Sequence, residues 1–498
     1  MNYKSTRDGK VSVSAAKAIA QGISKDGGLF VPESRPRLTN EDFAVLKTLS
    51  YPEKAKYILK YFLTDFTDEE LDYCVRGAYI GNFENDAPAP LKKTAENKYF
   101  LELWHGPTCA FKDLALRLLP YLLTTSVKKL GSDKETVILV ATSGDTGKAA
   151  LEGFRDVKGT KIIVFYPNDG VSAMQKRQMN TQKGENVFVS AIVGNFDDAQ
   201  TGVKKIFTDN AVAEKLAENG FAFSSANSIN WGRLVPQIVY YVSAYCDLLN
   251  SGADLKDGFN VTVPTGNFGN ILAAYYAREM GVPINRLICA SNENNVLTDF
   301  INTGKYNARR EFHTTISPSM DILISSNLER MLFELYGHDS DIVADLQRKL
   351  SETGEFSIND EALANLKKVF SAGCCDDKAT VETIGKYFKE NNYLIDTHTA
   401  VAARVADDYA EKTGDKRPMV VVSTASPYKF SSSVLKAVVP DKCGDDEFKM
   451  VEALHNATGV KVPETIAELE GLPERFSNVC EKQDMLNVVY DYLFKDKK

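Results

Sequence analysis

The sequence predicts an α/β protein in which parallel β-sheets carry helices on both faces. From about residue 100 onward, short β-branched and apolar runs alternate with helical apolar patterns. Parallel strands need a crossover connection, and a helix usually supplies it, so this alternation favours parallel sheets. Residues 1–94 differ from the rest, because they are rich in Lys, Glu and Tyr and predict a mainly helical N-terminal domain, with an apolar helical pattern over 11–20.

Seven runs have the length and composition of buried strands, with helical stretches between them. They are residues 136–141, 161–165, 187–193, 258–264, 287–290, 393–395 and 419–423. Two of these strands end in turns that contain glycine and lead into helices, predicted at 148–154 and 271–280. The segment NDAPAP at 85–90 separates this part from the N-terminal residues, since Pro and small residues interrupt regular structure.

Composition limits the class of protein. The chain has 498 residues, of which 44% are hydrophobic and 25% charged, so we expect a large core and two or more domains. The formal net charge of −8 argues against a nucleic-acid or anionic-membrane surface, which needs clustered Lys and Arg. The eight Cys and five His have no metal-ligand spacing, and the N-terminus has no apolar signal segment. We therefore expect a cytoplasmic protein with free thiols, no bound metal and no membrane span.

Three predicted strands end in small, polar turns, at 143–147, at 265–270 and at Thr424. In open parallel sheets, ligands bind beyond the carboxyl ends of the strands, so these turns should face a cleft. The 265–270 turn leads straight into a helix, where glycine allows close approach and the helix start offers unpaired N–H groups. This arrangement favours a phosphate site, although a glycine turn without a ligand explains the pattern equally well.

A lysine stands at the start of another predicted helix. Lys112 follows the segment HGPTCAF at 105–111 and precedes an apolar stretch over 114–119. Among apolar residues its amine loses hydration, which lowers its pKa and makes it a nucleophile near neutral pH. On these residues alone, a solvated lysine, or one paired with Asp113, is the plainer interpretation.

Several motifs carry a resemblance when they are taken together. The segments HGPTCAFKD (105–113), ATSGDTG (141–147), NSINWGRLVPQI (227–238), GNFGN (266–270) and STASPYKF (423–430) occur in this order, after YKSTRDG at 3–9. They resemble the threonine synthases, which are pyridoxal-phosphate enzymes of the tryptophan-synthase-β-like fold. The resemblance covers residues 3 to about 430, and Ala-Phe-Lys-Asp around the lysine differs from the pattern of the serine/threonine dehydratases of the same fold.

The resemblance implies two open, mostly parallel twisted sheets with helices on both faces, together with the mainly helical N-terminal domain. It implies an N-terminal domain over 1–94 and a smaller α/β domain over 129–231. Residues 95–128 and 232–498 would form the large cofactor-binding α/β domain.

The resemblance also implies how the cofactor, pyridoxal 5′-phosphate, is held. Lys112 matches the Schiff-base lysine, which is also the base that moves protons. Thr424 matches the residue whose hydroxyl faces the pyridine nitrogen, and Asp145 lies in the loop beside the ring. The cofactor phosphate would be held by five consecutive residues: Gly266, Asn267, Phe268, Gly269 and Asn270.

The substrate should be held at its two anionic ends. The resemblance assigns the substrate carboxylate to the loop residues Thr142, Ser143, Gly144 and Thr146, whose backbone N–H groups are suitable donors. A separate pocket is needed for the substrate phosphate, and Arg233 and Lys429 are the cations closest in sequence to the matching segments. If neither binds it, the 142–148 loop is the alternative.

The implied reaction is the conversion of O-phosphohomoserine and water to threonine and phosphate, by a monomer or a homodimer. Two alternatives remain, namely another pyridoxal-phosphate lyase such as a serine/threonine dehydratase, and an inactive protein that binds phosphorylated ligands. The chain departs from the family pattern at Ser426, where the family has His, and at Tyr428, where it has Ala. A role for that His is not transferable, and for His398 we expect a structural or helix-capping role.

Overall fold

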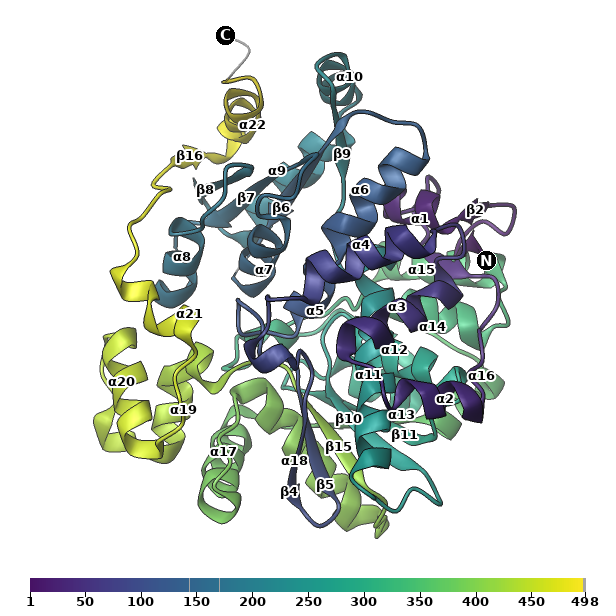
Figure 1. The fold of residues 1–498 in the computed structure, drawn as a ribbon, viewed down its shortest axis with the longest axis vertical. Coiled ribbons are helices and arrows are strands. Elements are labelled where there is room, and N and C mark those ends of the chain that lie inside the picture. The colour runs from purple at the N-terminus through teal and green to yellow at the C-terminus, as the bar shows by residue number, and fades with distance from the viewer. Residues whose placement is uncertain (143, 170, 496–498) are drawn as a thin grey trace.

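A computed structural model of the protein describes residues 1–142, 144–169 and 171–495. It contains two separate, mostly parallel sheets with helices packed around them (Figure 1). The predicted fold class is confirmed, because the strands pair in parallel and the connections between them are largely helical. Within the described residues, no helix combines the length and apolar character that a membrane crossing requires.

The larger sheet has six strands in the spatial order β14-β11-β10-β15-β5-β4. All neighbours are parallel except β4 and β5, which form an antiparallel hairpin at one edge. The strands are β4 (Leu91–Ala95), β5 (Lys98–Glu102), β10 (Phe259–Pro264), β11 (Ile284–Ser291), β14 (Phe370–Cys374) and β15 (Met419–Ser423). The central strands β10 and β15 are buried along their whole length, which explains their continuous apolar runs.

The smaller sheet has five strands in the order β16-β8-β7-β6-β9, and every neighbouring pair is parallel. Its strands are β6 (Glu135–Ala141), β7 (Thr160–Pro167), β8 (Val187–Val193), β9 (Phe221–Ser224) and β16 (Val479–Glu481). The helices α7 (Asp145–Phe154), α9 (Phe196–Thr208) and α10 (Asn210–Glu218) cover this sheet.

The N-terminal part packs against helices of the α/β core. It contains a three-stranded antiparallel sheet and four helices, α1 to α4. Helices α2 and α3 pack against α11, whereas α1 and α4 lie beside α6 (Leu119–Lys129) in Figure 1. The strands are β1 (Asn2–Ser5), β2 (Ser12–Ser14) and β3 (Phe30–Pro32). The helices are α1 (Ala15–Gln21), α2 (Asn40–Leu46), α3 (Tyr51–Phe62) and α4 (Asp68–Tyr79), and the core helix α11 spans Trp231–Asn250. Trp231, the first residue of α11, is fully buried between the rings of Tyr3 and Phe62, and this contact joins the N-terminal part to the core.

Two local predictions are wrong. Residues 393–395 form no strand; they connect α17 (Asp377–Asn391) to α18 (Thr397–Thr413), because Asn392 adopts a left-handed conformation and Asp396 caps the next helix. The pattern over 11–20 is helical only from Ala15, since residues 12–14 pair with β1.

The C-terminal segment departs from the expected division of the chain. It leaves α19 (Ser431–Val438) and α20 (Glu447–Thr458), shown in yellow beside the larger sheet, and runs along one side to α22 (Met485–Leu493) at the smaller sheet (Figure 1). There β16 pairs with the outer edge of β8, so residues 479–493 lie with 129–231 and not with the larger sheet. Three residue pairs between β16 and β8 cover an edge of β8 that would otherwise expose hydrogen-bonding groups.

The contact between α22 and the smaller sheet generates a stability prediction. Met485 is fully buried and its thioether packs directly on Gly202 of α9. Replacing Met485 with Ala leaves a cavity, so we expect the free energy of unfolding to fall by about 2–5 kcal/mol in a denaturant titration. Leu130→Ala, which changes an exposed leucine, is the control and should have little effect. Equal stability of the two variants would contradict this packing.

Candidate active site

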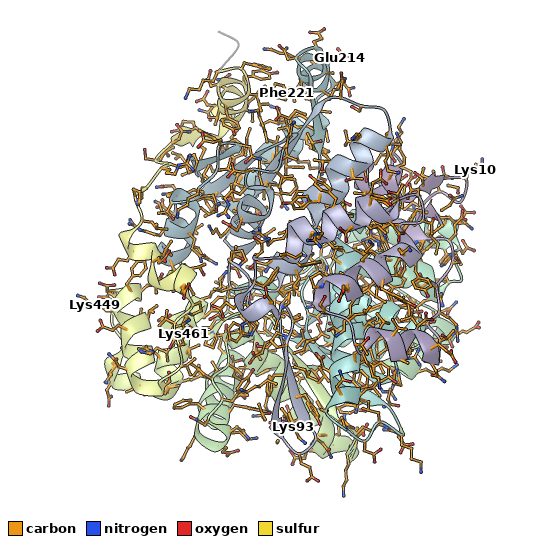
Figure 2. The ribbon with its side chains drawn as sticks, viewed as in Figure 1. Lys10, Lys93, Glu214, Phe221, Lys449 and Lys461 are labelled. Carbon is orange, nitrogen blue, oxygen red and sulfur yellow. The ribbon has the colours of Figure 1, made fainter. Side chains whose placement is uncertain are left out.

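The candidate residues come together between the two sheets. Lys112 begins α5 (Lys112–Leu116), Asp145 begins α7 after the end of β6, and Lys429 lies in the short helix η3 (Pro427–Phe430) beyond the end of β15. All three side chains are buried. They differ from the lysines labelled in Figure 2, such as Lys449 and Lys461, which extend outward from the surface of the protein.

Lys112 is buried at the start of its helix. Its Nζ lies 3.4 Å from the Ser319 hydroxyl, 4.0 Å from Oδ2 of Asp145 and 4.9 Å from the centre of the Phe111 ring. Burial removes hydration from the ammonium form and lowers the pKa of Lys112 to about 8, an effect that outweighs the opposing charge of Asp145. With this pKa roughly a tenth of the amine is neutral, and so nucleophilic, at pH 7, far more than for a lysine with the usual pKa of about 10.4.

Asp145 links two lysines across the cleft. Its Oδ1 lies 2.6 Å from Nζ of Lys429, whose side chain is only 1% exposed, and its Oδ2 faces Lys112. Burial alone would raise the pKa of Asp145, but the charges of Lys429 and Lys112 hold it below its usual range. Lys429 Nζ also donates to the carbonyl of Thr108, four residues before Lys112. Asp145 is thus an ionised carboxylate shared by two buried cations.

The loop before Asp145 is stabilised by hydrogen bonds to the side chain of Thr142. The Thr142 hydroxyl accepts hydrogen bonds from the N–H groups of Gly144 and Gly147, both at 3.0 Å. An added Cβ at Gly147 would lie 2.3 Å from Cγ2 of Thr142, so only glycine allows this close packing. The side chain of Thr142 therefore braces the loop, while Thr146 is partly exposed. Ser143, also predicted to bind substrate, lies outside the described residues.

The 266–270 segment forms the start of α12 (Gly269–Glu279), as predicted. Phe268 adopts a left-handed conformation with φ of 61°, which turns the chain into the helix. Among the described residues, the N–H groups of Gly269 and Asn270 find no backbone acceptor, as expected for a first helical turn. The segment is fixed from outside, because the Ser325 hydroxyl donates to the carbonyl of Gly266 and the Asn327 N–H to that of Asn267.

Asn270 presents a donor without a partner. The hydroxyls of Tyr240 and Tyr241 both donate to its Oδ1, at 2.6 Å each, which fixes the orientation of the amide. Its Nδ2 is buried and has no hydrogen-bond partner within the described part of the chain. A buried amide donor costs free energy unless an acceptor satisfies it, and an anion at the helix start would do so.

Thr424 is joined to the segment that carries Lys112. Its carbonyl accepts from the N–H of Phe111 at 2.8 Å, and the neighbouring Ala425 forms an antiparallel bridge with Ala110. The end of β15 and the start of α5 are therefore one hydrogen-bonded unit. Thr424 itself is buried at this junction.

Arg233 is a buried cation in the first turn of α11. Its Nη1 donates to the carbonyl of Ala226 at 3.0 Å, whereas its Nε has no partner among the residues that the structure describes. Burial lowers the pKa of Arg233 to about 10, and its positive charge contributes to the lowered pKa of Lys112. Arg233 is thus close enough to Lys112 to act on it electrostatically.

Ser319 and His398 complete the surroundings of Lys112, and sequence reasoning did not place Ser319 there. Nε2 of His398 accepts from the N–H of Ser319 at 3.1 Å, so its proton is on Nδ1, which lies 3.0 Å from Oδ1 of Asp396. His398 therefore fixes the short 3-10 helix η2 (Pro318–Met320), which presents the Ser319 hydroxyl to Lys112. No glycine turn or strand end marks this segment in the sequence, so only the spatial contact reveals it.

Comparison with known proteins identifies the family. Residues 2–79 match the family described as "Threonine synthase N terminus", 86–360 match "Pyridoxal-phosphate dependent enzyme" and 399–489 match "Threonine synthase, C-terminal". The threonine synthase of Pseudomonas aeruginosa is 40% identical over 438 residues, which cover 88% of this chain and 90% of that protein. The chain belongs to the threonine synthase family of pyridoxal-phosphate-dependent enzymes.

Solved structures of this family agree with that assignment. A pyridoxal-phosphate-bound threonine synthase from Brucella melitensis has 38% identity and a TM-score of 0.88, covering 99% of this chain and 98% of that one. The threonine synthase of yeast has 31% identity and a TM-score of 0.89, with 99% of both chains covered. The "Threonine synthase-like 1" proteins of Pongo abelii and Homo sapiens are each 40% identical, but the chain spans only 59% and 58% of their lengths.

The shared carboxylate of this threonine synthase family member leads to a stability prediction. Asp145→Asn leaves two buried lysines without their counter-charge, so the free energy of unfolding should fall by about 3–5 kcal/mol. The double variant Asp145→Asn, Lys429→Met removes one of the stranded charges and should recover part of the loss. Denaturant titration measures both.

Asp408→Asn provides the control, because Asp408 forms a comparable contact with Arg404, at 2.8 Å, on the surface. This exposed pair is screened by solvent, so its loss should leave stability nearly unchanged. An Asp145→Asn protein as stable as the control variant would refute the shared-carboxylate arrangement.

Proposed function

We propose that the protein is a carbon–oxygen lyase that converts O-phospho-L-homoserine and water to L-threonine and phosphate, with pyridoxal 5′-phosphate as cofactor. The observation that carries this proposal is the pair formed by Lys112 and the 266–270 segment. One supplies a buried amine of lowered pKa, and the other a helix start with unpaired donors. Membership of the family and nearly complete coverage of two threonine synthase structures support it.

The residues of the cleft fit the cofactor. A phosphate at the start of α12 would accept from the N–H groups of Gly269 and Asn270 and from the orphaned Nδ2 of Asn270. Gly266 admits no larger residue, because an added Cβ would lie 2.7 Å from the carbonyl of Ser319. Thr424 offers a hydroxyl to a ring nitrogen, and Lys112 offers the amine to which the aldehyde carbon bonds.

The chemistry needs proton transfers at successive carbons of the substrate. Bound pyridoxal phosphate supplies the electron sink that makes the substrate Cα proton acidic. Lys112 would remove one proton from Cα and one from Cβ, which allows the γ-phosphate to leave. Cγ then gains a proton, water adds its oxygen at Cβ, and Cα regains a proton. Asp145 and Lys429 set the charge around the amine, and the Ser319 hydroxyl lies within reach of the same proton.

We assign recognition of the substrate to two groups of residues, one that binds its carboxylate and one that binds its phosphate. The backbone N–H groups of the 142–147 loop suit the substrate carboxylate, with the Thr142 side chain holding that loop in shape. For the substrate phosphate, Arg233 is the better candidate, because Lys429 is already paired with Asp145. The guanidinium of Arg233 is buried, and its Nε has no partner within the described residues. A guanidinium can donate from two of its N–H groups to two oxygens of one phosphate.

The proposal is tested by product analysis with purified holoenzyme and O-phospho-L-homoserine. We expect threonine and inorganic phosphate to form in equal amounts. Release of ammonia and 2-oxobutyrate with negligible threonine would identify a dehydratase instead. If no product of either kind forms although the cofactor is bound, the protein is an inactive relative that binds phosphorylated ligands.

Attachment of the cofactor should report the pKa of Lys112. The amine attacks only when it is neutral, so the rate at which pyridoxal phosphate bonds to the apoprotein should rise with pH and level off above about 8. An ordinary lysine would level off only above about 10.4. Stopped-flow absorbance measures this rate, and borohydride reduction with peptide mapping should find the cofactor on Lys112. A label on Lys148 or Lys429 would refute the assignment.

Arg233→Met should weaken the binding of the substrate phosphate and spare the cofactor. Loss of a charge-assisted hydrogen bond costs about 1.5–3 kcal/mol, which corresponds to roughly 10- to 100-fold weaker competition by inorganic phosphate. Lys429→Met is measured beside it, and the cofactor absorbance of both variants is the control. If neither variant alters phosphate affinity, the phosphate lies elsewhere, in the 142–148 loop.

A further inference from the structure

A second cleft, of about 440 Å³, lies outside the site described above. It is formed where the residues after α4, the 105–107 segment, α7, α8 (Ala173–Asn180) and the C-terminal segment 464–472 meet. Neither Lys112, Asp145 nor the 266–270 segment lines it. The proposed reaction leaves this cleft without a role.

The buried part of the cleft carries an excess of positive charge. Arg117, Lys148 and Arg155 surround one carboxylate, Glu152, with N–O distances of 3.7, 3.6 and 2.7 Å. Arg117 and Glu152 are buried, and burial is the main cause that lowers the pKa of both Arg117 and Lys148. The carboxylate of Asp113 adds negative charge nearby, but it is already bonded to the N–H and hydroxyl of Thr108. Three cations near two carboxylates leave an excess of positive charge, which the anionic group of a ligand can balance.

A buried acceptor in the wall of the cleft lacks a donor. Gln178 is 1% exposed, and its Oε1 has no hydrogen-bond partner within the described residues. Gln178 lines the cleft from α8. An unsatisfied buried carbonyl oxygen costs free energy, so a ligand that carries an N–H donor would stabilise it.

The outer part of the cleft has the opposite charge. Glu84, Glu464 and Glu468 line it and are exposed to solvent, accompanied by the single exposed lysine Lys183. The cleft also has apolar walls, to which Phe83, Leu469 and Leu472 contribute. Buried cations, an unsatisfied buried acceptor, exposed carboxylates and apolar side chains in one cleft form a complement for a zwitterion with an apolar side chain.

We propose that this cleft binds a free L-α-amino acid with an apolar side chain. Its carboxylate lies at the Arg117, Lys148 and Arg155 cluster, and its ammonium group donates to Gln178 Oε1 and faces the outer glutamates. Its side chain packs against Phe83, Leu469 and Leu472. A volume of about 440 Å³ is ample for such a ligand.

Binding in this cleft acts on the candidate active site through two helices. Arg117 is the capping residue of α5, the helix that begins with Lys112. Lys148 lies one turn after Asp145 on α7. An anion that draws Arg117 and Lys148 together shifts the two helices relative to each other, and so shifts Lys112 relative to Asp145. This regulatory consequence rests on the proposed function, whereas the binding site itself does not.

The binding test uses L-leucine as the probe and holoenzyme reduced with borohydride. Reduction fixes the cofactor on Lys112, so an added amino acid cannot react with it, and mass spectrometry verifies that the cofactor is fixed. We expect one equivalent of L-leucine to bind in isothermal titration calorimetry. Removal of either charged group of the probe, as in 4-methylpentanoate or 3-methylbutylamine, should weaken binding at least tenfold.

Matched variants locate the ligand. Lys148→Met and Glu468→Gln should each weaken L-leucine binding at least fivefold. Lys449→Met and Glu470→Gln should leave it unchanged, because both control residues are exposed and neither lines the cleft. Glu468→Gln changes an exposed residue, so it remains informative if Lys148→Met fails to fold.

The outcomes separate the inference from the proposed function. Binding of L-leucine that responds to the cleft variants supports the site, whether or not O-phosphohomoserine is turned over. Failure of L-leucine to bind, equal binding of 4-methylpentanoate, or binding that Glu468→Gln leaves intact would overturn it. In an active enzyme, L-leucine should change kcat/KM at least twofold in the unmodified protein and not in Glu468→Gln. A constant kcat/KM would overturn the regulatory part.

Discussion

The carboxylate of Asp145, held between Lys112 and Lys429, is the interaction on which the candidate active site depends. It joins three distant parts of the chain: the start of α5, the start of α7 and the segment that follows β15. Buried ionic groups are costly to dehydrate, so such a cluster persists only when the surrounding packing imposes it. Here the packing consists of two sheets whose strand ends meet, with the hydrogen bond from Phe111 to Thr424 fixing α5 on β15.

The pKa of Lys112 follows from this arrangement. Desolvation favours the neutral amine, while the negative charge of Asp145 favours the ammonium form. The nearby charges of Lys429 and Arg233 act in the same direction as desolvation, and the outcome is a pKa of about 8. Without Asp145 the amine would lose its proton more easily still, and without Lys429 it would hold its proton more tightly. The three charges therefore tune one proton, as the role proposed for Lys112 requires, because such a group has to both remove and return a proton.

Much of the fold could be predicted from the sequence, because buried parallel strands produce continuous apolar runs that periodicity detects. The runs at β6, β7, β8, β10, β11 and β15 were all found in this way. The strand β14 was missed because its sequence, FSAGC, is neither long nor strongly apolar, and it sits at the sheet edge. At residues 393–395 a strand was predicted where the structure has none. A short apolar run between two helices resembles a strand when only its length is considered.

The site was predictable where backbone geometry constrains the residue type. Gly147, Gly266 and the lysine at a helix start leave a pattern in the sequence, and family motifs then suggest their roles. Ser319 and the two tyrosines that orient Asn270 leave none, because their contacts join segments far apart in the chain. The pairing of Lys429 with Asp145 was also unforeseen, and it is why Arg233 is the stronger candidate for the substrate phosphate.

The C-terminal segment has a consequence for any motion between the two sheets. The chain passes between the two sheets near residues 130 and 230. It passes between them a third time between α21 (Glu464–Ala467) and β16, and α22 then packs in an apolar cluster with the smaller sheet. Arg177 of α8 holds this third connection by donating hydrogen bonds to the carbonyls of Leu469 and Leu472. Any opening of the cleft between the two sheets therefore has to be accommodated at all three crossings. The segment 129–231 also lacks one strand of its own sheet, because β16 is supplied from the other end of the chain.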